Sequence, residues 1–104
     1  MSRKIIDVKP EYLEIIKSIL RINIPDFEVW AFGSRVTGKP KSYSDLDLAI
    51  KGKTKLPLNK LALLKMDFEE SDLPFRVDIL DWNRISPEFQ SLILKGFEVI
   101  QKPN

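Results

Sequence analysis

In the stretch AFGSRVTGKPKSYSDLDLAI, residues 31–50, the end of one strand, a turn and a second strand can be recognised, and the predicted fold is built around them. Gly33 and Ser34 follow an apolar run, and after ten further residues Asp45 and Asp47 alternate with leucine. Acidic and apolar residues that alternate at a period of two predict a β-strand with one buried face. Both aspartates therefore project from one face of this strand. The opposite, buried face carries Leu46, Leu48 and Ile50.

The residues before this stretch predict one helix and one strand. From Pro10 to Ile22, apolar residues recur at three- and four-residue spacing, and proline suits the first turn of a helix. Pro25 and Asp26 end this helix. Residues 27–33, FEVWAFG, are rich in aromatic residues and valine, so they predict a largely buried strand that ends at the glycine. The apolar residues of the helix are Tyr12, Leu13, Ile15, Ile16, Ile19 and Leu20.

Residues 34–44, SRVTGKPKSYS, connect this strand to the aspartate strand. Gly38, Pro40 and the serines of this segment predict a loop over most of its length. Ser34 is expected to cap a short helix over the residues that follow it.

The segment after the aspartate strand predicts a helix and then a third strand. The helix is expected over residues 58–70, after the polar connection GKTKLP. The third strand is expected within PFRVDILDW, residues 74–82, and ends at Asn83. The buried stripe of the helix is expected to contain Leu58, Leu61, Ala62 and Met66.

The last segment predicts one more helix and a short final strand. Ser86, Pro87 and Glu88 combine a capping hydroxyl, a first-turn proline and an acid that suits the helix dipole. Gly96 is expected to stop this helix, and residues 97–100, FEVI, predict the strand. The apolar face of the helix is expected to contain Phe89, Leu92 and Ile93.

This order of elements indicates an α/β fold of the α+β type, in which helices flank a small mixed β-sheet. With 104 residues and 43% hydrophobic composition, the chain is expected to form a single domain over residues 1–104 with a modest core. No apolar run has the length of a signal peptide or a membrane span, so a soluble, cytoplasmic protein is expected.

The composition restricts the chemistry of any active site. The chain has no cysteine and no histidine, which excludes thiolate nucleophiles, Ser-His-Asp catalysis and the usual zinc sites. Carboxylates, lysines and hydroxyls remain, and a metal bound by them would be a hard ion such as Mg²⁺ or Mn²⁺. The net charge of +2 is too small to indicate a general nucleic-acid binder. Lysines nevertheless gather around the aspartate pair, either as a solvated surface or as a polyphosphate attractant: Lys39, Lys41, Lys51, Lys53, Lys55, Lys60 and Lys65.

Asp45 and Asp47 are candidate ligands of a metal ion. Two carboxylates on one strand face repel each other unless a cation lies between them, and Mg²⁺ with a nucleoside triphosphate needs only a few protein oxygens. The competing interpretation is an exposed strand face with two solvated acids. Gly33 and Ser34 would supply what a phosphate needs, because a glycine allows close backbone approach and the hydroxyl donates; an ordinary turn is the alternative. Arg35 is a candidate phosphate clamp or a surface arginine.

A two-metal site needs a third carboxylate, and the third strand offers two candidates. Asp78 lies in mid-strand between Val77 and Ile79, whose shared face is expected to be buried. Asp81 lies at the strand end, where a turn or capping role is the preferred interpretation. Asp78 is therefore the predicted third acid.

These residues resemble the minimal nucleotidyltransferases of the DNA polymerase β-like nucleotidyltransferase superfamily. The signature of that family is Gly-Ser, ten residues, Asp-x-Asp and a later strand acid. Gly33, Ser34, Asp45, Asp47 and Asp78 match it without an insertion. The local sequences GSRVTG and SDLDL also resemble those usual in the family, and the predicted order of elements agrees with the family over nearly the whole chain.

The resemblance implies transfer of a nucleoside monophosphate, AMP from ATP, to an acceptor, with release of pyrophosphate. Gly33 and Ser34 would then hold the triphosphate, and Asp45, Asp47 and Asp78 would hold two Mg²⁺ ions, with Mn²⁺ as the alternative. Asp78 would also contact the acceptor hydroxyl. Family members of this size resemble the antitoxin of pairs whose toxin is an all-helical HEPN protein, and some adenylylate that toxin on tyrosine.

Two other functions stay open at this point. One is an antitoxin or binding subunit that neutralises its partner by contact and has a vestigial nucleotide site. The other is a nucleic-acid-binding domain that uses the lysines, which steep salt dependence would reveal. The strand-associated aromatic residues are interpreted as core instead of base-stacking platforms: Phe27, Trp30, Phe32, Phe75 and Trp82. Apolar outer helices leave a homodimer or a helical partner open.

Overall fold

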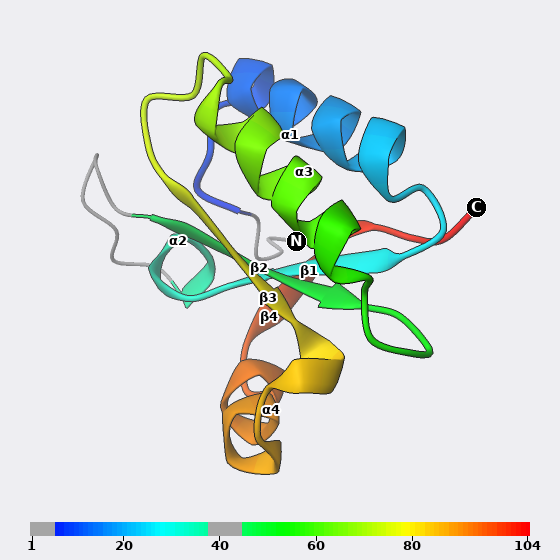
Figure 1. Ribbon diagram of the computed structural model, residues 1–104. Coiled ribbons are helices and arrows are strands. Elements are labelled where there is room, and N and C mark those ends of the chain that lie inside the picture. The colour runs from blue at the N-terminus through cyan, green and yellow to red at the C-terminus, as the bar shows by residue number, and fades with distance from the viewer. Residues whose placement is uncertain (1–5, 38–44) are drawn as a thin grey trace.

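The computed structural model describes residues 6–37 and 45–104, which form a four-stranded sheet and its helices (Figure 1). The strands are β1 (Glu28–Phe32), β2 (Leu46–Lys51), β3 (Val77–Asp81) and β4 (Phe97–Gln101). The helices are α1 (Pro10–Asn23), α2 (Ser34–Thr37), α3 (Leu58–Glu69) and α4 (Pro87–Leu94), with a 3₁₀ turn, η1, at Trp82–Arg84. Every predicted helix and strand is therefore present. Ser34 begins α2 itself instead of capping it, and residues 38–44 of the predicted loop lie outside the described residues.

The sheet is mixed, as predicted, and its strand order is β3-β2-β1-β4. β1 pairs antiparallel with both β2 and β4, whereas β3 runs parallel to β2. A parallel neighbour requires a crossover, and α3 supplies it between β2 and β3. This crossover brings β3 beside the aspartate strand.

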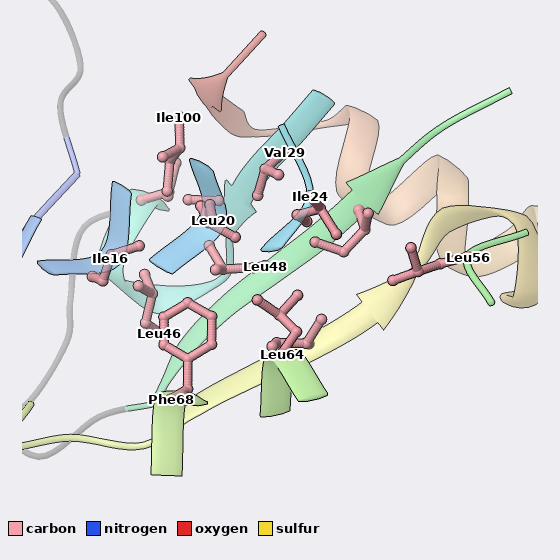
Figure 2. Packing of buried hydrophobic residues seen from close by; sticks show 14 residues of the cluster. Ile16, Leu20, Ile24, Val29, Leu46, Leu48, Leu56, Leu64, Phe68 and Ile100 are labelled. Atoms are coloured by element: carbon pink, nitrogen blue, oxygen red, sulfur yellow. The ribbon is translucent and has the colours of Figure 1, made fainter. Parts of the chain in front are cut away.

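Helices α1 and α3 lie over one face of the sheet, and α4 projects from the other (Figure 1). The main core fills the space beneath α1 and α3 and takes Leu46, Leu48 and Ile50 from β2, as the alternation of that strand predicts. Figure 2 shows Leu46 and Leu48 among Ile16 and Leu20 of α1 and Leu64 and Phe68 of α3. A smaller cluster beneath α4 contains Trp30, Ala49 and Ile93.

The predicted buried stripe of α3 is wrong at three of its positions. Leu58 is 64% exposed, Met66 is 50% exposed, and Ala62 is also exposed. The helix instead buries Leu64 and Phe68, with Leu61 packed partly against them. Leucines occur on several sides of this helix, so more than one stripe fits the helical period, and packing against α1 selects one of them.

The capping prediction for α4 is confirmed, but its predicted apolar face is only partly buried. Ser86 Oγ accepts a hydrogen bond from the Phe89 N–H at 3.1 Å. Of the predicted face, Ile93 is buried, whereas Leu92 is 61% exposed and Phe89 is 37% exposed. The helix reaches the sheet mainly through Ile93, and the other two side chains border a hollow described below.

Asp81 has the structural role expected of a turn or capping residue. Its carboxylate is buried and accepts hydrogen bonds from the N–H groups of Leu56 and Asn83, at 2.7 and 2.9 Å. Arg84 Nε donates to the same carboxylate at 3.1 Å. These bonds fix the end of β3 and the start of η1. Over the described ranges, no helix combines the length and apolarity needed to cross a membrane.

Candidate functional site

The turn at the end of β1 lies directly against the carboxylate of Asp47. Gly33 has φ +84°, a backbone conformation that residues with a side chain rarely adopt. A Cβ at this position would collide with Oδ2 of Asp47. The glycine is therefore needed for two reasons, its backbone conformation and the close approach of the carboxylate.

Asp47 and Asp78 are direct neighbours on adjacent strands. They are register partners in the parallel β2–β3 pair, so their side chains leave the same face of the sheet. Adjacent strands lie about 4.8 Å apart, which brings two carboxylates into one small region. Asp45 is exposed and stands just before β2 begins at Leu46. The three predicted acids thus gather at one end of the sheet face.

The electrostatics of Asp47 show that this gathering is unfavourable without a cation. Burial of the carboxylate, followed by the negative charges of Asp78 and Asp45, raises the pKa of Asp47 from 3.8 to about 6. Each cause disfavours the charged form of the same group. A bound cation would remove the repulsion, so the site favours a positively charged ligand.

This pKa shift predicts how stability depends on pH in the metal-free protein. The folded chain retains the Asp47 proton up to about pH 6, whereas the unfolded chain loses it near pH 3.8. The stability that Asp47 contributes is therefore present below pH 3.8 and is lost as the pH rises through about 6. Urea unfolding in EDTA should show Asp47→Asn gaining stability over wild type across this window, with a constant difference above it. A difference that does not change with pH would contradict the shift.

A hard divalent cation fits this donor set by its chemistry. Carboxylate oxygens are the ligands that Mg²⁺ and Mn²⁺ prefer, and a cation would offset the burial and the neighbouring charges of Asp78 and Asp45 that raise the pKa of Asp47. Within residues 6–37 and 45–104, no three acidic side chains are already arranged around a single ion position. Phosphate oxygens and water would supply the remaining ligands, as is usual for Mg²⁺.

Ser34 and Arg35 follow the glycine in different environments. Ser34 is half-buried at the first position of α2. Arg35 is only 7% exposed, and its guanidinium lies 4.2 Å from the ring centroid of Phe75. Its Nη1 donates to the Asp7 carbonyl at 2.8 Å, and the Asp7 N–H donates back to the Arg35 carbonyl at 2.7 Å. Arg35 therefore anchors the turn to the N-terminal segment, and its contact with phosphate stays a prediction.

The structure adds two recesses that sequence patterns did not indicate. A hollow of about 250 Å³ borders Gly33 and lies between Phe32 of β1 and Phe89 and Leu92 of α4. Phe32 is the cross-strand partner of Asp47, so this hollow lies beside the carboxylates. A groove of about 560 Å³ borders Asp78 on the other side. The alternation of β1 places Phe32 and Asp47 on one face, but only the position of α4 creates the hollow.

The surrounding lysines and aromatic residues have separate roles. Lys53, Lys55 and Lys60 are exposed, Lys39 and Lys41 lie outside the described residues, and only Lys65 borders the groove at Asp78. Lys51 lies over the rings of Trp30 and Trp82, at 5.5 and 5.9 Å from their centroids. All five strand-associated aromatic residues pack against one of the two core clusters, which confirms their interpretation as core.

Comparison with known proteins identifies a family over most of the chain. The family described as polymerase beta, nucleotidyltransferase, matches residues 13–104. A protein of Haemophilus influenzae named "Probable protein adenylyltransferase MntA" is 53% identical over 97 residues, which cover 93% of this chain and 85% of that protein.

Solved structures share the fold. A chain of the crystal structure of a toxin–antitoxin with AMP-PNP matches with a TM-score of 0.73 and 24% identity, covering 88% of this chain and 74% of that one. A chain of tri-AMPylated Shewanella oneidensis HEPN toxin in complex with MNT antitoxin matches with a TM-score of 0.62 and 22% identity. That match covers 86% of this chain and 72% of the other. At these identities the likeness supports the same arrangement of sheet and helices.

Proposed function

This chain belongs to the polymerase beta nucleotidyltransferase family, and from that premise we propose that it transfers AMP from ATP to a hydroxyl group of a protein acceptor. The observation that carries the proposal is the meeting of three features on one sheet face. The Gly33 turn contacts the Asp47 carboxylate, and Asp78 stands beside Asp47 in the strand register. These features support a site in which the turn binds phosphate and the three acids lie within reach of one substrate.

Each residue has a distinct role in the proposed reaction. The backbone at Gly33 and the hydroxyl of Ser34 bind the triphosphate. The glycine allows close approach of the backbone to a phosphate, and the serine hydroxyl donates a hydrogen bond to a phosphate oxygen. Asp45, Asp47 and Asp78 would hold Mg²⁺, two ions being expected and Mn²⁺ being the alternative. Bound there, Mg²⁺ would neutralise the phosphate charge and orient the triphosphate for in-line displacement. The main contribution of the chain is therefore positioning and charge compensation.

Asp78 is the acid proposed to contact the acceptor. Its carboxylate accepts the proton of the acceptor hydroxyl as the hydroxyl oxygen bonds to the α-phosphorus. The bond between the α-phosphorus and the bridging oxygen breaks at the same time, and pyrophosphate leaves with that electron pair. Asp78 lies at the edge strand and beside the open groove, so an acceptor can approach it without crossing the triphosphate site.

The proposed biological role is that of an antitoxin whose acceptor is a HEPN-type toxin. Two observations support it: the relative from Haemophilus influenzae is named a protein adenylyltransferase, and the matching solved structures come from toxin–antitoxin complexes that contain AMP-PNP or an AMPylated toxin. A cytoplasmic location is part of this proposal. The acceptor would be a separate protein, as the AMPylated toxin is in the matched complex with an MNT antitoxin.

The test is transfer from α-labelled ATP to the product of the adjacent gene in the source genome. With Mg²⁺ and the wild-type chain, label should enter that protein, and EDTA should abolish the labelling. The double variant Asp45→Asn/Asp47→Asn should not label it, whereas Asp72→Asn, an exposed acid outside the site, should label it normally. An unlabelled complex of the two proteins would instead support neutralisation by contact, with a vestigial nucleotide site.

A further inference from the structure

We propose that the free edge of β3 binds the acceptor as an extended polypeptide segment, which pairs with the strand beside Asp78. This inference rests on the proposed function and specifies how its acceptor is held. β3 is the last strand of the sheet order and pairs only with β2 among the described residues. Figure 1 shows β3 in yellow, with the green helix α3 on one side of the sheet and α4 on the other.

The orientation of the β3 backbone determines which N–H and C=O groups are available at the sheet edge. The Leu46 N–H donates to the Arg76 carbonyl at 2.9 Å, so Arg76 turns its backbone toward β2. In a parallel ladder, alternate residues face the same neighbour. Asp78 therefore also faces β2, and Val77 and Ile79 turn their N–H and C=O groups outward. No hydrogen bond to these outward groups comes from the described residues.

A groove runs along the same edge and reaches the proposed catalytic acid. Its volume is about 560 Å³, and one wall is the continuous strand segment Phe75–Ile79, which includes Asp78. Lys65, Phe68 and Glu69 of α3 are on the other side. The outward backbone groups thus border this recess, and the Asp78 carboxylate leaves the opposite face of the same edge strand.

The chemistry of the groove selects a polypeptide as its occupant. Outward N–H and C=O groups at every second residue match those of an extended chain, which is how edge strands bind peptides. Lys65 and Arg76 are balanced by Glu69 and Asp78 around the groove, and such mixed charge does not suit a polyanionic nucleic acid. Apolar surface from Phe68 and Phe75 suits the side chains of a peptide.

Strand pairing also explains how the hydroxyl would reach the acid. Side chains that lie opposite each other on paired strands leave the same face and stand about 5 Å apart. A serine, threonine or tyrosine opposite Asp78 would therefore present its hydroxyl to that carboxylate. The side chains on either side of it would point toward the opposite face, where α3 stands.

The first test uses degenerate peptides with a fixed central tyrosine, serine or threonine as acceptors for α-labelled ATP. N-methylation of the peptide backbone removes one N–H donor at a time. We expect labelling to fall about tenfold when the methylated residue faces β3, the loss expected for one hydrogen bond, and to stay within about twofold at the intervening positions. If the loss of labelling does not alternate between successive methylated positions of the peptide, the proposal is wrong.

The second test measures amide hydrogen exchange of the strand in the full chain, with Mg²⁺ and the α,β-methylene analogue of ATP, whose α–β link the proposed transfer cannot break. The Val77 and Ile79 amides should exchange rapidly in the free chain. Their exchange rates should fall about tenfold when a peptide of the kind that accepts label in the first test binds. The Asp78 and Leu80 amides face β2 and are the internal controls, which should not change. If Val77 and Ile79 are already protected without peptide and lose this protection on dilution, the edge binds a second copy of this chain, and the proposal is wrong.

The failure of this inference can be distinguished from the failure of the proposed function. If a folded acceptor protein is labelled and no peptide is, the enzyme is active and the extended-segment proposal is wrong. If neither is labelled while AMP-PNP still binds, the transfer function itself is wrong, and this inference falls with it.

Discussion

Asp47→Asn is expected to lower the rate of nucleotidyl transfer by about a thousandfold, roughly 4 kcal/mol of transition-state stabilisation, while the metal-free protein becomes more stable above pH 6. The rate falls because asparagine lacks the negative charge that would hold a divalent cation against the triphosphate. Stability rises because the carboxylate is disfavoured by burial and by the charges of Asp78 and Asp45. Transfer kinetics and urea unfolding in EDTA measure the two effects on the same samples.

Asp81→Asn is the matched control, since it makes the same change in a second carboxylate of the same sheet. Asp81 accepts hydrogen bonds from two backbone N–H groups and from Arg84, so its loss should destabilise the fold by about 2 kcal/mol. Its folded fraction should transfer at the wild-type rate. Opposite effects on stability, with a rate loss at Asp47 alone, would separate the proposed catalytic acid from the structural one. Equal rate losses would contradict that division.

Gly33→Ala is expected to lower transfer about a hundredfold and to destabilise the fold by at least about 1–2 kcal/mol. The φ of +84° costs any residue with a Cβ, and the added methyl group collides with Oδ2 of Asp47. Relief of this collision must move either the turn that would bind the triphosphate or the carboxylate that would bind the cation. Calorimetry with AMP-PNP and Mg²⁺ should show weakened binding by the folded variant.

A double-mutant cycle distinguishes the two causes of the Gly33→Ala effect. In an Asp47→Ala background the carboxylate is absent, so the collision disappears and only the cost of the backbone conformation remains. The stability loss from Gly33→Ala should therefore be smaller in that background than in wild type. The same loss in both backgrounds would show that contact with Asp47 is not part of the penalty.

The two recesses on either side of the acids suggest how the site divides its substrates. The hollow that borders Gly33 adjoins the proposed triphosphate turn, and the groove at the edge of β3 adjoins Asp78. Phosphate on one side and acceptor on the other is the arrangement that in-line displacement requires. Both recesses come from the positions of helices: α4 forms one wall of the hollow, and α3 forms one wall of the groove.

Local sequence patterns account for the helices and strands and for the side of β2 on which its acids lie. Leu46 and Leu48 enter the core and Asp47 leaves the other face because alternation along a strand is a local consequence of backbone geometry. The capping serine of α4 could also be predicted from the sequence, since Ser86 Oγ accepts a hydrogen bond from the backbone N–H only three residues away. These features depend on residues that are close in the chain.

Long-range strand pairing and helix packing determine which distant residues meet. Asp78 stands beside Asp47 because β3 pairs parallel to β2 in one register, and a slip of one residue would have turned that acid to the opposite face. The buried stripe of α3 was set by packing against α1, since its leucines fit more than one stripe. The free edge of β3 is likewise a property of strand order. Pairing and packing between segments that are far apart in the chain carry no local signal, and the proposed site is built from such contacts.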